Sequence, residues 1–250
     1  MISYPIRING VDVHAQYTEQ AVRAIFLPLL QKLTDMQKEK NGRILVFLAA
    51  PPGAGKSTLV SFLEHLSRER EGLCPLQGIG MDGFHRRQSD LLSATTLRDG
   101  KRISLVEIKG APMTFDLPHL TDRIREIASG AVCGWPVYDR LLHNPVEDAV
   151  QVRAKIVLLE GNYLLLREEG WDRLSEYADY TISVHADEAM LRTCLIERRI
   201  HTGVARDAAV RFVDFSDMPN VRLCLKKTKP VDLCIRIDEN NDYHVEPAPV

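Results

Sequence analysis

The sequence is short of the features that mark secreted and membrane-spanning proteins. Its five cysteines are an odd number and form no C-x-x-C pair, which favours reduced thiols over a disulfide framework. The opening segment MISYPIRING has no basic-then-apolar run of a signal peptide, and no apolar stretch approaches the roughly 20 residues of a bilayer span. These absences predict a cytoplasmic chain without a membrane partner.

An excess of charge of one sign is also missing. The chain has 32 basic and 34 acidic residues, which gives a formal net charge of −2. No global field therefore favours nucleic acid or a membrane surface as a partner. Any anion site must be local, and basic residues are concentrated between Met190 and Lys229.

What the sequence does have is the composition of a globular protein. Hydrophobic residues make up 45% and charged residues 26% of its 250 residues, which argues against disorder and low-complexity scaffolds. A chain of this length forms one large or two small domains. We therefore expect a core that needs no partner chain to fold.

Residues 1–42 have the pattern of an added extension. Apolar and polar side chains alternate on both sides of Asn9-Gly10, which predicts a β-hairpin with a two-residue turn. Residues 19–40 have helical periodicity, although Pro28 should bend or interrupt that helix. We interpret the chain as this extension followed by a domain over 43–250. The extension could serve dimerisation or cover a sheet edge.

The remaining chain alternates strand-like and helix-like segments. Residues 43–50 form a nearly continuous apolar run, which is typical of a strand covered on both faces. Short apolar runs and helical stretches then take turns as far as Ile237. This order predicts an α/β fold, with a doubly wound, mainly parallel sheet and helices on both faces.

The strongest motif is A-P-P-G-A-G-K-S-T at residues 50–58, which lies between the apolar run and an amphipathic helix. This is the pattern of a P-loop, in which glycine lets backbone N–H groups wrap a polyphosphate at a helix N-terminus. Lys56 should reach the β and γ phosphates of ATP, and Ser57 should bind Mg²⁺. The predicted ATP-binding residues are Gly53, Ala54, Gly55, Lys56, Ser57 and Thr58. Ala50 stands where the strict pattern has glycine.

Two acidic residues follow apolar runs at predicted strand ends, where open α/β sheets bind ligands. Asp82 lies in M-D-G-F-H at residues 81–85 and could accept a proton from a hydroxyl or organise Mg²⁺. An Asp-Gly turn without chemistry is the alternative. Glu160 ends the apolar run 156–159, a Walker-B arrangement that holds a metal ion through its water shell. A solvated strand cap is the alternative for Glu160.

Five collinear motifs make the sequence resemble the P-loop kinases grouped as uridine kinase, phosphoribulokinase and type I pantothenate kinase. The resemblance is strongest to the branch called fructose transport system kinase-like. The motifs are APPGAGKST, MDGFH, KGAPMTFD at 109–116, WPVYDRLLHNPVEDA at 135–149 and LLEGNYLLL at 158–166. The resemblance implies a P-loop NTPase fold with a helical lid at about residues 190–217. Residues 89–108 match no motif of the family.

The resemblance also implies residue roles. Asp82 would act as general base or metal organiser beside Lys56. The Y-D-R-x-x-H block places Tyr138, Arg140 and His143 where relatives contact the acceptor, and His85 is similarly placed. For this block, a strand-end turn held by its own hydrogen bonds is the alternative.

The basic helix near residue 198 occupies the position of the lid in this family. There Arg198 would act on the transferring phosphoryl group and Arg199 on the nucleotide. An exposed basic helix face is the alternative. The D-M-P-N block at residues 217–220 has no assigned role.

Together these expectations describe an ATP- and Mg²⁺-dependent kinase that phosphorylates a hydroxyl of a small metabolite, whether sugar, nucleoside or pantothenate-like. The alternative is a regulatory nucleotide-binding protein with slow ATP hydrolysis. A GTPase is disfavoured because the sequence has no N-K-x-D signature. No nucleic-acid partner is expected, and a homodimer is left open.

Overall fold

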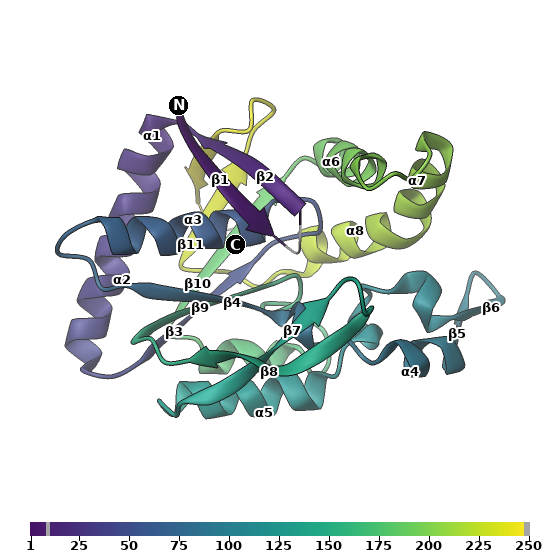
Figure 1. The fold of residues 1–250 in the computed structure, drawn as a ribbon, viewed down its shortest axis with the longest axis horizontal. Coiled ribbons are helices and arrows are strands. Elements are labelled where there is room, and N and C mark those ends of the chain that lie inside the picture. Colours follow the sequence, from purple (N-terminus) through teal and green to yellow (C-terminus); the bar gives the residue numbers. More distant parts are fainter. Residues whose placement is uncertain (9–10, 248–250) are drawn as a thin grey trace.

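The central feature of the fold is one mainly parallel sheet (Figure 1) in a computed structural model that describes residues 1–8 and 11–247. Its strands pair in the order β12-β11-β10-β3-β9-β4, and only the β11–β12 pair is antiparallel. The strands are β3 (Ile44–Ala49), β4 (Leu76–Gly80), β9 (Ile156–Gly161), β10 (Tyr180–Ala186), β11 (Leu233–Ile237) and β12 (Tyr243–Glu246). This topology confirms the predicted fold class.

Strand β3 lies in the interior of the sheet because all its side chains are apolar. Ile44, Val46 and Leu48 face one hydrophobic core, and their neighbours Leu45 and Phe47 face the other. A strand that is apolar on both faces must be covered by two layers. Because β3 lies between β10 and β9, the P-loop that follows it begins at the carboxyl end of a central strand.

Helices cover both faces of the sheet. On one face lie α2 (Leu27–Lys40), α3 (Lys56–Glu69) and α6 (Glu188–His201), and on the other lie α5 (Leu117–Ala128) and the 3₁₀ helix η5 (Asp172–Tyr177) (Figure 1). The predicted lid corresponds to α6 followed by α7 (Arg206–Phe212), the π-helical turn η6 (Val213–Asp217) and α8 (Met218–Lys227). Within the described residues, no helix has both the length and the apolar character to cross a membrane.

The N-terminal extension contains the predicted hairpin and helix. β1 (Ile2–Ile8) pairs antiparallel with β2 (Val11–Tyr17), while the predicted turn at Asn9-Gly10 lies outside the described residues. The following helix runs through α1 (Glu19–Ala21), a π-helical turn η1 (Val22–Phe26) and α2. Proline cannot donate to the carbonyl four residues earlier, and its ring crowds that carbonyl. The interruption expected from Pro28 takes the form of this wider turn.

The hairpin packs on the domain rather than pairing with it. β1 and β2 form a two-stranded sheet of their own. The ring of Tyr17 stacks on Phe62 of α3, with 4.1 Å between ring centroids, and lies 5.7 Å from Tyr243 at the start of edge strand β12. Burying aromatic surface in this way stabilises the position of the hairpin.

Two further hairpins were not identified in the sequence. One, β5 (Thr95–Arg98) and β6 (Lys101–Ser104), follows α4 (Gln88–Ser93) in the segment that matches no family motif. Its turn residues Asp99 and Gly100 both have positive φ, at 50° and 74°, as a type I′ turn requires. The other is β7 (Cys133–Asp139) with β8 (Asn144–Val152). Further 3₁₀ turns are η2 (Met81–Phe84), η3 (Leu105–Ile108) and η4 (Pro112–Thr114).

Candidate active site

The P-loop has the backbone geometry of an anion cradle. Gly53 and Gly55 have φ of 90° and 72°, a region that only glycine enters readily. α3 begins at Lys56 without a side-chain cap, so the N–H groups of its first turn are available to an anion. Ala50 is not among the positive-φ residues, which explains why alanine is tolerated where the strict pattern has glycine.

The P-loop is supported from one side by α6. A Cβ atom on Gly53 would lie 3.0 Å from Leu195 Cγ and 3.1 Å from the carbonyl oxygen of Leu191. The first half of α6 therefore touches the phosphate-binding loop directly, and the second half carries the arginines predicted for the lid.

Glu160 lies beside the first turn of α3, as the Walker-B interpretation requires. Its register partner on β4 is Gly80, and Ser57 Oγ donates a hydrogen bond to Glu160 Oε1 at 2.6 Å. The side chain is buried and its Oε2 has no hydrogen-bond partner. Burial raises the pKa of Glu160, and the charge of Asp82 adds to the effect, while Lys56 and the Ser57 hydroxyl oppose it.

A hydroxyl and a carboxylate with a free oxygen suit Mg²⁺, which takes oxygen ligands and is bound in proteins through one or two carboxylates together with substrate phosphates. Ser57 and Glu160 fit this chemistry. No group of three or more His, Cys, Asp or Glu side chains within the described part of the chain forms a complete protein-only metal site.

Asp82 lies on η2, directly after β4. A Cβ atom on Gly83 would come within 2.0 Å of the Pro136 carbonyl oxygen, so glycine is needed for this turn to lie against β7. Trp135 Nε1 donates to the Gly80 carbonyl at 2.8 Å and fixes the two segments together. The D-G-F block is therefore a tightly packed platform that presents one carboxylate to the cleft.

The charges around Asp82 favour its ionised form. Burial alone would raise the pKa of Asp82, but His85, Lys56, Arg140 and Arg198 outweigh burial and lower it. His85 itself has its pKa lowered to about 4, chiefly by burial, so it is neutral at pH 7. The three cations therefore hold Asp82 ionised at neutral pH.

A cavity of ≈ 170 Å³, here called the acceptor cleft, lies between η2 and β7. Ser57, Asp82, Tyr138 and Glu160 are among the residues that line it. The cleft thus connects the predicted metal ligands with Tyr138, whereas the other predicted acceptor residues, His85, Arg140 and His143, are not in its lining. It places the two carboxylates on the side of α3 where the γ-phosphoryl group of a P-loop nucleotide lies.

The predicted acceptor residues occupy different parts of the β7–β8 hairpin. Tyr138 is on β7 and its ring lies 5.3 Å from that of His85. Arg140 is exposed in the turn but close enough to Asp82 to lower its pKa. His143 is exposed at φ 52°, and its carbonyl oxygen, rather than its imidazole, contacts the cluster.

Lys109 is a member of this cluster that sequence reasoning did not identify. Its Nζ donates to Tyr138 Oη at 2.5 Å, to Gln88 Oε1 at 3.0 Å and to the His143 carbonyl at 3.3 Å. Burial lowers the pKa of the Lys109 amine. The K-G-A-P-M-T-F-D motif was the available signal, but its lysine could be assigned no role until these partners were known.

The two lid arginines have different surroundings. Arg198 is exposed to solvent, and its charge contributes to the lowered pKa of Asp82. Arg199 donates to Asp217 Oδ2 at 3.1 and 3.3 Å, and its guanidinium lies 3.5 Å from the centroid of the Phe212 ring. The D-M-P-N block, whose role was unassigned, thus joins Arg199 of α6 to η6 through the buried carboxylate of Asp217.

No family model matches the chain, but the chain is similar to several known proteins. The chain is 40% identical over 240 residues to the uncharacterized protein YggC of Escherichia coli (strain K12), covering 96% of this chain and 97% of that protein. It is 27% identical over 240 residues to the pantothenate kinase of Bacillus velezensis (strain DSM 23117 / BGSC 10A6 / LMG 26770 / FZB42), covering 84% and 72%.

A solved structure extends the similarity to three dimensions. A protein from Silicibacter sp. TM1040, provisionally described as a fructose transport system kinase, has a TM-score of 0.73 and 29% identity, covering 83% of this chain and 98% of that chain. The buried β3, the glycine loop and the strand-end carboxylates are the parts expected of such a kinase. The chain belongs to the P-loop kinase family that includes uridine kinases and pantothenate kinases.

Proposed function

We propose that the protein transfers the γ-phosphoryl group of ATP to a hydroxyl group of a small metabolite. The observation that carries the proposal is the position of Asp82, which lines the same cleft as Ser57, Tyr138 and Glu160. Lys56, Arg140 and Arg198 lower the pKa of this carboxyl against the effect of burial. A regulatory nucleotide switch needs no such carboxylate on the acceptor side.

The residues have distinct parts in the transfer. Lys56 and the N–H groups of the P-loop hold the β and γ phosphates, and Ser57 and Glu160 are the residues that would hold Mg²⁺. Bound Mg²⁺ neutralises charge on the β and γ phosphates. Because phosphoryl transfer passes through a loose transition state, positioning and charge stabilisation account for most of the acceleration.

Asp82 orients the acceptor. Its carboxylate accepts the hydrogen bond of the hydroxyl, the hydroxyl oxygen bonds to the γ-phosphorus, and the bond from that phosphorus to the β,γ-bridging oxygen breaks. The hydroxyl proton passes to Asp82 and ADP leaves. A carboxylate with a lowered pKa is a weak base, which suits a transition state in which the proton moves late. Arg198 stabilises the charge on the transferring group from the lid.

The acceptor side favours a small polar molecule with hydroxyl groups. Tyr138 and Lys109 offer hydrogen-bonding groups, and Arg140 offers an unpaired cation within the described residues. His85 lies behind this surface: its Nδ1 is buried without a partner, it is not in the lining of the cleft, and its ring is 5.3 Å from that of Tyr138. A sugar, a nucleoside or a pantothenate-like molecule satisfies these groups.

The test is an ATP-coupled activity screen over phosphorylatable metabolites with the wild type and Asp82→Asn. An acceptor should raise ATP turnover in the wild type, and Asp82→Asn should lower kcat by about 10²–10⁴-fold, the usual contribution of a general base. Asp122→Asn, an exposed carboxylate on α5, is the matched control and should leave kcat unchanged. ATP hydrolysis that no acceptor stimulates would favour the regulatory switch instead.

A further inference from the structure

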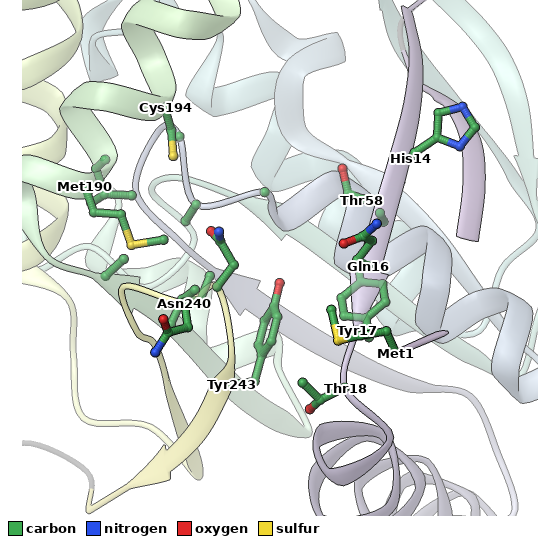
Figure 2. A pocket seen from close by; sticks show the side chains of 18 residues that line it. Met1, His14, Gln16, Tyr17, Thr18, Thr58, Met190, Cys194, Asn240 and Tyr243 are labelled. Atoms are coloured by element: carbon green, nitrogen blue, oxygen red, sulfur yellow. The ribbon is translucent and has the colours of Figure 1, made fainter. Parts of the chain in front are cut away.

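A second cavity, of ≈ 360 Å³, opens on the other side of the P-loop (Figure 2). It shares no lining residue with the acceptor cleft. Its volume falls in the range of about 300–1,000 Å³ that is typical of small-molecule sites. Gly53, Gly55 and Thr58 form part of its lining. A nucleotide whose phosphates lie on the P-loop therefore places its base and ribose in this cavity.

Three segments far apart in the sequence form the walls. Met190, Leu191 and Cys194 come from α6, and Asn240 and Asn241 come from the turn between β11 and β12. The remaining wall is residues 14–18, which are the end of β2 and the residue that caps α1. Figure 2 shows Gln16 and Tyr17 on the β2 side, with Met190, Cys194 and Asn240 across the cavity.

We propose that the N-terminal hairpin is part of the nucleotide site and that Gln16 helps to select adenine, an inference that rests on the proposed function. On β2 the side chains of Ala15 and Tyr17 are buried, whereas Gln16 between them is exposed. Gln16 is also one of the residues that line the cavity, so its exposed side chain is within reach of a ligand there. The extension thus forms a wall of the site, a role beyond dimerisation or sheet-edge cover.

The chemistry of the lining matches an adenine base. The amides of Gln16, Asn240 and Asn241 can each donate and accept a hydrogen bond, and adenine presents an amine donor next to a ring-nitrogen acceptor, the pair that Asn and Gln bind in bidentate fashion. None of the 18 lining residues is Asp, Glu, Lys or Arg. A guanine base, by contrast, presents adjacent donors that a carboxylate would satisfy.

The end of the N-terminal hairpin is fixed to the segment that follows Asn240 and Asn241, across the cavity. Thr18 Oγ1 donates to Asp242 Oδ1 at 2.8 Å and accepts from the Ala21 N–H at 3.0 Å. The rings of Tyr17 and Phe26 pack on Tyr243, at centroid distances of 5.7 and 5.2 Å. These contacts hold Gln16 and Asn240 at a fixed separation before a nucleotide binds, which lowers the entropy cost of recognition.

The experiment measures binding rather than catalysis. Wild type, Gln16→Ala and Gln20→Ala are titrated by calorimetry with Mg²⁺ and ATP, UTP or inorganic tripolyphosphate. Gln20 is an exposed glutamine on α1 of the same extension and does not line the cavity, so it is the matched control. Gln16→Ala should raise the Kd for ATP about three- to tenfold, as expected for one lost hydrogen bond, and should reduce the preference for ATP over UTP.

The tripolyphosphate titration separates base recognition from phosphate binding. Gln16→Ala should leave the Kd for tripolyphosphate within about twofold, because Gln16 faces the base. An unchanged Kd for ATP, or equal losses for ATP and tripolyphosphate, would overturn the inference while the proposed function stands. A wild type that binds neither ATP nor tripolyphosphate would overturn the proposed function as well. Urea unfolding should give the same midpoint for all three proteins.

Discussion

The two cavities beside the P-loop differ in the charge of the side chains that line them. The acceptor cleft contains two carboxylates, and Lys56, Arg140 and Arg198 surround one of them. Among the described residues that line the second cavity, where we place the base, there is no Asp, Glu, Lys or Arg, and amide, ring and sulfur-bearing side chains form half of the lining. Transfer of a phosphoryl group needs charge to be stabilised, whereas selection of a base needs neutral hydrogen-bonding groups and shape. One loop serves both because its phosphate-binding backbone lies between them.

We expect the largest effect from removing the charge of Lys56, beside the acceptor cleft. Lys56→Ala should lower kcat/KM for ATP by about 10³-fold, because an electrostatic contact to the transferring phosphoryl group is removed. It should also weaken tripolyphosphate binding, which Gln16→Ala should not do. Coupled-assay kinetics and calorimetry measure the two quantities.

Lys155→Ala is the control for that experiment. Lys155 is exposed, and it precedes β9 at the end opposite Glu160. Equal losses in Lys56→Ala and Lys155→Ala, or tripolyphosphate binding untouched by Lys56→Ala, would remove Lys56 from the phosphate site.

The next effect separates two neighbours in the lid. Arg198→Ala should lower kcat by about 10²-fold with little change in stability, because Arg198 is exposed and its charge acts at Asp82. Arg199→Ala should mainly lower the free energy of unfolding, by about 1–3 kcal/mol, because it leaves the carboxylate of Asp217 buried without its partner. Steady-state kinetics and urea unfolding distinguish the two.

Arg199 remains predicted from the sequence as a nucleotide ligand, and the same pair of variants tests that role. A loss of kcat/KM for ATP in Arg199→Ala as large as in Arg198→Ala, at unchanged stability, would place Arg199 on the nucleotide. It would also contradict a purely structural part for its bond to Asp217.

The smallest expected effect is the pH dependence due to His85. Its pKa is lowered to about 4, chiefly by burial, from an ordinary value of about 6.5. The folded protein therefore disfavours the protonated form, and unfolding takes up a proton below pH 6.5. The contribution of His85 to stability is complete above pH 6.5 and is lost as the pH falls toward 4.

Between pH 7.5 and pH 5 this loss should be on the order of 2 kcal/mol. Urea unfolding at several pH values, with wild type and His85→Gln compared at each, measures it. The difference between the two proteins should shrink as the pH falls. A difference that stays constant across this range would show that the imidazole is free to protonate in the folded protein.

The fold and the phosphate-binding loop could be predicted because their signals are local. The continuous apolar run before Ala50, the glycines of the loop and the amphipathic helix after it follow one another directly in the sequence. Each of these patterns predicts its own local structure for a physical reason. The positions of Asp82 and Glu160 followed from the rule that strand ends meet at one edge. The hairpin at Asp99-Gly100 also had a local signal, because an Asp-Gly pair readily adopts the positive φ angles that its turn has. This hairpin was nevertheless not predicted.

The rest depended on partners that are distant in the sequence. Lys109 contacts residues 21 to 34 positions away, and no periodicity indicates such pairs. The bond between Arg199 and Asp217 spans a helix end, α7 and a π-helical turn. A motif can draw attention to these residues, but only the packing of α6 to α8 shows that Arg199, and not the exposed Arg198, is paired with Asp217.

The sequence by itself determined the loop that we propose binds polyphosphate, because glycine conformations and helix N-termini are properties of a short segment. Only the tertiary structure decided the directions in which the pKa values around that site shift. Asp82 and Glu160 are both acids at strand ends, yet the pKa of one is lowered and that of the other is raised. Burial and Coulomb energy depend on distances through space, and the chain sets those distances only when it folds.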